Sequence, residues 1–225
     1  MADSTRTPVR HPWLSAALCV ALLSGCTSGV ESSRPGAVAE TPIAADTMPE
    51  TPDSRSGDLG QEDLPPPAEL GRGWAYRIDK GNAEDGYLGS GEPATAREPA
   101  SVLAAITPLG CRPRPLPMPE TALEVTYQRG DTPGVGLALQ FAAEAEAARF
   151  FIVHSRVLKQ CTNAGRVELA IERRTSDLLV STRIEQLGQT PAWSEGVRLR
   201  GNEVMLIAVA ESSARGIRTV TSAQT

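Results

Sequence analysis

The chain has 225 residues, of which 40% are hydrophobic but only 4% aromatic, and a formal net charge of −5. This length allows one or two domains with an aliphatic core, whereas so few aromatic rings argue against a large aromatic-lined pocket. Residues 27–70 carry about −7 of the charge, and the chain beyond residue 70 carries about +1. The nearly neutral C-terminal part therefore lacks the basic footprint of a nucleic-acid-binding protein.

The N-terminus has the organisation of an export signal. Arg6 and Arg10 precede an apolar run of about ten residues, which is shorter than a membrane-spanning helix. The run ends in Leu23-Ser24-Gly25-Cys26, which resembles the lipobox of bacterial lipoproteins. This resemblance implies that residues 1–25 are a cleaved signal peptide and that Cys26 carries acyl chains such as palmitate. The protein would then be anchored on the outer face of the cell membrane. The alternative is an ordinary cleaved signal that ends in cysteine.

The segment after the signal, residues 26–70, predicts a disordered tether. It is rich in Ser, Thr, Pro, Asp and Glu and shows no apolar period of 2 or 3.6. We therefore expect the folded domain in residues 71–225, with its compact core in residues 109–211.

The first part of this domain, residues 71–120, is transitional. Alternating large residues predict a strand at 74–78, and Pro99 and Pro108 bracket a short helix at 99–106. The alternating prolines of residues 112–119 predict an extended run. This run is either a rigid connector or an epitope for a binding partner.

Periodicity predicts the elements of the core. Alternating apolar residues predict a hairpin, apolar residues at spacings of three and four predict a long helix, and further alternation predicts several more strands. The expected ranges are 121–128 and 135–141 for the hairpin, 142–162 for the helix, and 167–172, 178–187, 197–200 and 203–210 for the later strands. This order predicts an α+β domain, in which an antiparallel sheet of about six strands carries one long and one short helix.

Only two cysteines remain once Cys19 leaves with the signal and Cys26 is lipidated, namely Cys111 and Cys161. In an oxidising compartment such a pair favours a disulfide over two free thiols or metal ligands. Closing a loop of about 50 residues would stabilise the fold by on the order of 4 kcal/mol in the loop-entropy model.

The core also resembles a known family over residues 109–211. The residues that carry the resemblance are a helix of the form Ala-x-x-x-Ala-x-x-Phe-Phe ending in Cys161, a connection containing Trp193, and a strand that follows Arg200-Gly201-Asn202. This order is similar to the PknH-like extracellular sensor domain of actinobacterial receptor kinases and lipoproteins. The resemblance implies a ligand-sensing module with a V-shaped cleft and no catalytic residues. The family usually has a second disulfide near its C-terminal strands, whereas no cysteine follows Cys161.

The candidate functional side chains are few. His154 is the only imidazole of the expected mature chain, and neither a Gly-x-Ser-x-Gly turn nor a glycine-rich phosphate loop is present. We expect His154 to pack on the inward stripe of its helix, with a ligand contact as the alternative. Trp193 is either a lid on the core or a platform for a ligand. We predict no catalytic residues, no metal and no cofactor.

Together these observations predict a membrane-anchored extracytoplasmic lipoprotein with a non-catalytic sensing or ligand-binding domain, not an enzyme. Its ligand would be a small molecule, a cell-wall fragment or an envelope protein. The alternative is a structural or assembly factor of the cell envelope that binds another protein. A cleft beside the long helix would favour the first function, and a flat exposed apolar patch would favour the second.

Overall fold

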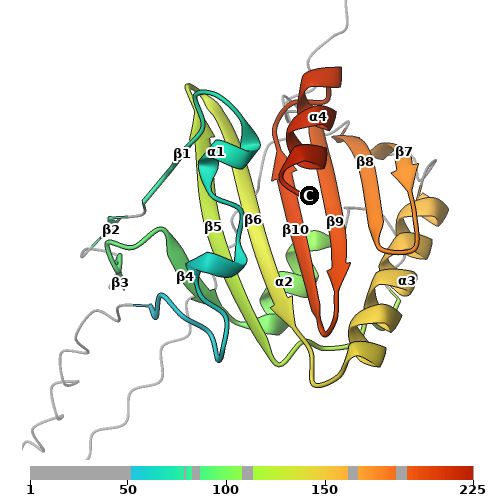
Figure 1. The fold of residues 1–225 in the computed structure, drawn as a ribbon, viewed down its shortest axis with the longest axis horizontal. Helices are drawn as coiled ribbons and strands as arrows, with labels where there is room; N and C mark the ends of the chain where they lie inside the picture. The colour runs from blue at the N-terminus through green and yellow to red at the C-terminus, as the bar shows by residue number, and fades with distance from the viewer. Residues whose placement is uncertain are drawn as a thin grey trace, which may run out of the picture. The chain divides into compact units, whose positions relative to one another are not determined.

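A computed structural model describes residues 52–78, 80–82, 87–107, 114–161, 167–185 and 192–224. All of them belong to one compact unit, Asp46–Thr225. They form an antiparallel sheet with helices on both faces, which confirms the predicted α+β class (Figure 1). The predicted signal peptide, Cys26 and Cys111 lie outside the described residues. None of the helices in the described ranges combines the length and the apolar composition needed to span a bilayer.

The described residues form ten strands, and eight of these make up the main sheet, where about six were expected. The strands are β1 (Ala75–Tyr76), β2 (Gly81–Asn82), β3 (Tyr87–Leu88), β4 (Ala94–Arg97), β5 (Thr121–Arg129), β6 (Thr132–Gln140), β7 (Val167–Arg174), β8 (Leu178–Glu185), β9 (Trp193–Arg200) and β10 (Glu203–Val209). The helices are η1 (Gln61–Asp63), α1 (Pro67–Leu70), α2 (Pro99–Ile106), α3 (Glu144–Cys161) and α4 (Ala214–Ser222). The order across the sheet is β1-β5-β6-β10-β9-β8-β7, and β4 pairs with β5 beside β1. Strands β2 and β3 form a separate two-stranded ribbon.

The β5–β6 hairpin is the centre of the predicted core, and its register runs from Thr121 opposite Gln140 to Arg129 opposite Thr132. Gly130 takes the left-handed conformation of the turn at φ 56°. Both faces of the hairpin are buried, because other segments of the chain cover both faces of the sheet. Side chains alternate along a strand, so each strand supplies both cores.

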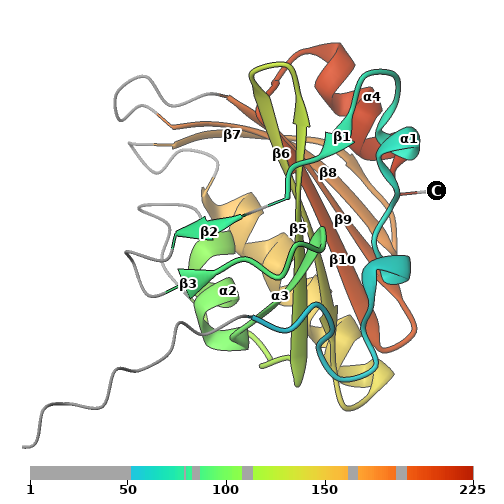
Figure 2. The ribbon, with the colours of Figure 1, turned by 90° about the vertical axis from the view of Figure 1, so that its left-hand side faces the viewer.

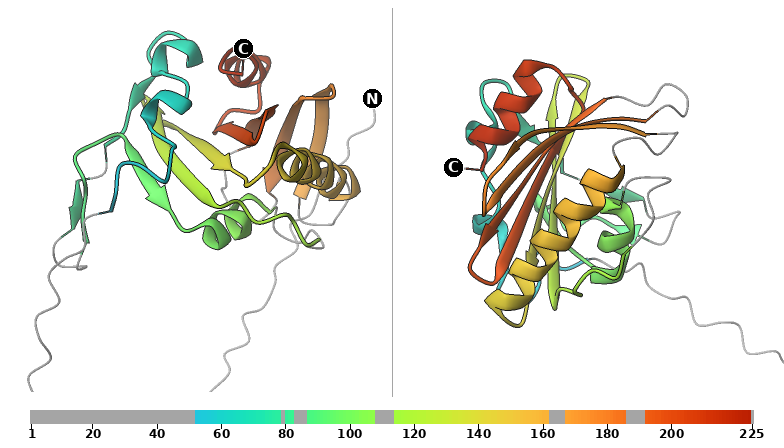
Figure 3. Two further views of the ribbon diagram at one scale, coloured as in Figure 1. Left: turned by 60° about the horizontal axis from the view of Figure 1, so that its bottom comes forward. Right: turned by 90° about the vertical axis from the view of Figure 1, so that its right-hand side faces the viewer.

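Helices α2 and α3 cover one face of the sheet (Figure 3). Their apolar residues pack on a core cluster whose members include Val102, Phe141, Phe150, Leu158 and Leu206. The α3 stripe is the one predicted from its three-and-four spacing, and α2 occupies the range expected for the short helix. Glu98 begins α2 by accepting a hydrogen bond from the Ser101 backbone N–H at 2.7 Å.

The N-terminal segment and α4 cover the opposite face (Figure 2). Leu59, Leu64 and Leu70 are 1%, 3% and 2% exposed and belong to the second core cluster. The Tyr127 hydroxyl donates a 2.7 Å hydrogen bond to the carbonyl of Pro65. These contacts correct the expected boundary of the tether at residue 70. Residues 52–70 are part of the fold, because their isolated leucines find partners on the sheet rather than on their own segment.

Helix α4 extends the core beyond the expected limit at residue 211. Val220 is fully buried against the sheet, and the Gln224 amide donates to the carbonyl of Gly196 at 2.9 Å. A side chain at Gly196 would crowd this contact, since a Cβ there would lie 3.2 Å from Gln224 Cγ.

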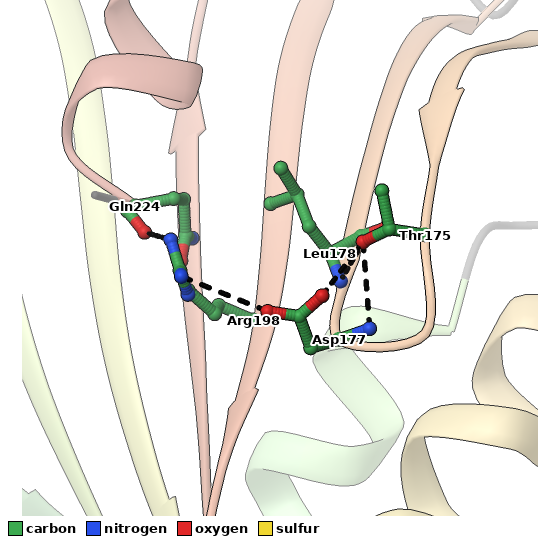
Figure 4. Close-up of polar contacts among 5 residues, drawn as sticks. All are labelled: Thr175, Asp177, Leu178, Arg198 and Gln224. Atoms are coloured by element: carbon green, nitrogen blue, oxygen red, sulfur yellow. Dashed lines mark hydrogen bonds and ion pairs between the residues drawn. The ribbon is translucent and has the colours of Figure 1, made fainter.

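Arg198 links the end of the chain to the β7–β8 turn (Figure 4). Its guanidinium donates to the carbonyl of Gln224 and lies 3.6 Å from the carboxylate of Asp177. The Thr175 hydroxyl in turn donates to that carboxylate at 2.8 Å, which lowers the pKa of Asp177. The C-terminal residues are therefore fixed to the sheet by polar contacts as well as by apolar packing.

Candidate functional site

A cavity of about 230 Å³ lies between the sheet and helices α2 and α3. Five neighbouring strands and both helices contribute to its walls. The lining residues are Ala105, Ile106, Glu124, Val135, Leu137, His154, Arg183, Trp193, Glu195, Leu206 and Ala208. The walls are thus mainly apolar, with polar groups brought in by α3, β5, β8 and β9.

The sheet register brings the polar residues of β8 and β9 together. Arg183 lies directly opposite Trp193, and Glu195 lies two residues further along β9, opposite Ser181. Residues two apart on a strand share a face. Arg183, Trp193 and Glu195 therefore all project towards the α3 side of the sheet, where the cavity lies.

Arg183 and Glu195 form an ion pair in the cavity wall. Arg183 Nη2 lies 2.8 Å from Glu195 Oε1, and each side chain is only 15% exposed. Partial burial strengthens the electrostatic attraction between the two groups, but it also removes much of the water that would solvate them. Each charge therefore depends on the other for compensation. The pair presents both a hydrogen-bond donor and an acceptor group to the cavity. A second pair joins Glu124, also a lining residue, to Arg97 on β4 at 3.4 Å.

His154 lines the cavity from α3 and is 4% exposed. Its ring stacks on that of Phe150, with centroids 5.7 Å apart and an interplanar angle of 6°. Burial lowers the pKa of the imidazole from 6.5 to about 4. The side chain is accordingly neutral near pH 7, and it can offer one N–H donor and one nitrogen acceptor but no positive charge.

Trp193 is the first residue of β9, not part of a connecting loop as the sequence suggested. Its half-buried side chain forms part of the cavity wall. The structure thus brings together His154 and Trp193, which the sequence singled out separately.

Cys161 lies in the last turn of α3 and is 2% exposed. It is not a free thiol in the structure. Since Cys111 lies outside the described residues, the pairing of these two cysteines stays a prediction.

Sequence reasoning did not single out Arg183 or Glu195. Arg183 occurs among the alternating polar and apolar positions of an expected strand, which is also the pattern of an ordinary solvated sheet face. Glu195 falls in the connection expected before the strand at 197–200. Only the pairing of β8 with β9 reveals that these two charges meet.

The cavity suits a small ligand with an apolar body and a polar group. An apolar protein cavity of about 150 Å³ can hold a benzene molecule, so the present volume accommodates a substituted ring or a short aliphatic chain. The described lining residues include no hydroxyl or thiol side chain beside His154 that could serve as a nucleophile. Within the described residues, no group of three or more His, Cys, Asp or Glu side chains is arranged to hold a metal ion.

Comparison with known proteins finds no matching family model and no matching curated protein. Among solved structures, the chain is similar to the extracellular domain of PknH from Mycobacterium tuberculosis, with 10% identity and a TM-score of 0.42 over 73% of this chain and 89% of that one. It is also similar to an uncharacterized protein from Mycobacterium smegmatis, an Rv0999 ortholog, with 9% identity and a TM-score of 0.35 over 72% of this chain and 98% of that one. Both similarities are distant.

Proposed function

We propose that the chain is an extracytoplasmic ligand-binding or sensing protein that binds a small molecule without transforming it. The observation that carries this proposal is the cavity beside α3, in which apolar walls surround the Arg183–Glu195 pair and the neutral imidazole of His154. A largely apolar pocket with a few convergent polar groups is the usual form of a small-molecule site.

The Arg183–Glu195 pair supports recognition rather than simple stability. Replacing a buried ion pair by apolar residues of similar volume is often neutral or stabilising. An ion pair in a cavity wall is thus better explained by contacts with a ligand than by a contribution to stability. Its guanidinium and carboxylate suit a ligand that carries both an acceptor and a donor, such as a carboxamide.

The exposed apolar residues do not favour the alternative of an assembly factor. The large hydrophobic residues that are exposed in the described part of the chain are Ile78, Met118, Ile152 and Ile184. Their exposures are only 44%, 54%, 43% and 39%, so these four side chains present little of the large apolar surface that a protein-binding patch needs.

A cavity-filling substitution tests the site. Indole is a suitable probe, because it is apolar, carries one N–H donor and matches the cavity in size. Titrated into the full-length chain, it should shift the NMR signals of the Trp193 and His154 side chains. Ala208→Phe should reduce indole affinity at least tenfold, because the added ring occupies the cavity.

Ala170→Phe is the matched control, since Ala170 is exposed on β7 and lies outside the cavity lining. It should leave indole binding unchanged. Undiminished binding to the Ala208→Phe variant would show that the cavity is not the site.

We further propose that Cys26 is lipidated and anchors the protein on the outer face of the membrane. The support is the run Leu23-Ser24-Gly25-Cys26 after a short apolar segment. Cys26→Ala should leave the precursor unprocessed and without acyl chains, as judged by intact mass and by labelling with a palmitate analogue. A processed and acylated Cys26→Ala protein would contradict the anchor.

A further inference from the structure

A second hollow, also of about 230 Å³, lies on the opposite face of the sheet between α1 and α4. Its lining includes four arginines, namely Arg72, Arg129, Arg215 and Arg218, and one acid, Glu69. The arginines come from three separate parts of the chain: the loop after α1, the end of β5, and α4. The fold therefore gathers positive charge here that the sequence leaves dispersed.

Arg129 forms a fixed part of this hollow. Its guanidinium pairs with the carboxylate of Glu211 and lies 4.7 Å from the ring centre of Trp74. The Arg129 side chain is 15% exposed. Such double support holds the side chain in place, so it is preorganised rather than mobile.

The other three arginines are not neutralised in this way. Arg72, Arg215 and Arg218 are exposed, and no ion pair within 4 Å joins them to any other residue that the structure describes, although the charge of Arg215 acts on Glu211. With Glu69 and Glu211 counted against the four arginines, the hollow keeps an excess of two positive charges.

Two of these arginines occupy electrostatically unfavourable positions on α4. Arg215 lies in the first turn of α4, although the N-terminal end of a helix favours negative charge. The turn itself has no acidic residue, and Glu211, which accepts a hydrogen bond from the N-cap Ser213, is already paired with Arg129. Arg218 lies one turn further on the same side, so the two like charges also repel each other. An anion bound between them would relieve both unfavourable interactions.

We propose that this hollow binds a phosphoryl group, and this inference is independent of the cavity beside α3. A phosphate monoester carries about −1.5 to −2 charges near pH 7, which matches the excess of two, whereas a single carboxylate does not. Arginine forks also bind phosphate oxygens in pairs, which gives a geometry that lysine cannot reproduce. The phosphoryl group could belong to a soluble phosphate ester or to the headgroup of an anionic lipid, and experiment distinguishes these sources.

The test uses the full-length chain and two probes. The first is inorganic phosphate, followed by calorimetry at low salt. The second is vesicles of phosphatidylcholine with and without phosphatidic acid, whose headgroup is a phosphate monoester, followed by sedimentation. The double variant R215Q/R218Q should weaken binding at least tenfold, and R218K should weaken it to a smaller extent because the charge remains but the fork is lost. Binding to phosphate would indicate a soluble ester, and binding only to the vesicles that contain phosphatidic acid would indicate a lipid headgroup.

The matched control is R149Q/R156Q, which removes two exposed arginines from α3 on the other face. It should bind like the parent and unfold at the parent temperature, because both of its side chains are exposed. R215Q/R218Q should unfold at or slightly above that temperature, since it removes two exposed charges that repel each other. The proposal is overturned by absence of binding to both probes, by unchanged binding in R215Q/R218Q, or by an equal loss in R149Q/R156Q.

Discussion

His154 couples the stability of the fold to pH. Burial lowers the pKa of its imidazole to about 4, whereas the same group in the unfolded chain titrates near 6.5. Between these two values the unfolded state binds a proton that the folded state does not. The free energy of unfolding therefore falls as the pH falls from about 6.5 to about 4, and the contribution of this group is constant outside that window.

His154→Gln tests this coupling. We expect the parent to lose on the order of 3 kcal/mol more stability than the variant on acidification from pH 7.5 to pH 4, because glutamine has no proton to gain. Urea unfolding at several pH values provides the measurement. Carboxylates that titrate near pH 4 affect both proteins and cancel in the difference. Parallel stability curves for the two proteins would contradict the assignment.

Only some of the site residues could be predicted from the sequence. His154 and Trp193 stood out because each is rare in this chain, and rarity is visible without a structure. Arg183 is a common residue type at an alternating position of an expected strand, and Glu195 is one in an expected connection. Their relation depends on the β8–β9 register, which connects positions twelve residues apart and is not specified by local pattern.

At the scale of single elements, the periodicity of apolar residues predicted the long helix and the hairpin. The helix expected at 142–162 is α3, Glu144–Cys161, and the expected hairpin is formed by Thr121–Arg129 and Thr132–Gln140. The N-terminal segment was missed because its leucines have no regular spacing. They are buried by tertiary partners such as Tyr127, and composition alone does not show such partners.

The leucines of this segment should contribute strongly to stability. Leu64→Ala removes a side chain that is 3% exposed, so it should lower the free energy of unfolding by about 2 to 5 kcal/mol. Asp58→Ala, at an exposed position of the same segment, should change it by less than about 0.5 kcal/mol. Denaturant titration compares the two variants. A similarly small effect of both substitutions would mean that the segment packs only weakly.

The end of α3 should be linked to the segment that precedes β5. If Cys161 pairs with Cys111, peptides containing the two residues remain joined in a non-reducing digest and separate after reduction. Cys161→Ser and Cys111→Ser should each cost about 2 to 5 kcal/mol, and the double variant should cost little more, since either change opens the same loop. Alkylation of both thiols in the native protein would rule out the link.

At the scale of the whole domain, the sheet is buried on both faces and offers a different surface chemistry on each. The α3 side encloses the largely apolar cavity, whereas the α4 side carries the arginine-lined hollow. Both depend on segments that the sequence placed outside the compact core: α2 for the cavity, and residues 69–72 with α4 for the hollow. A protein shortened to residues 109–211 should therefore lose both sites together with much of its stability.

The central claim is that the cavity beside α3 holds a small molecule that the protein binds unchanged. Native mass spectrometry of the full-length chain, isolated from cells of its source organism, tests this claim most directly. We predict a non-covalently bound mass in the parent that is absent from Ala208→Phe and retained in Ala170→Phe. The bare protein mass in the parent, or the same bound mass in all three proteins, would contradict the account.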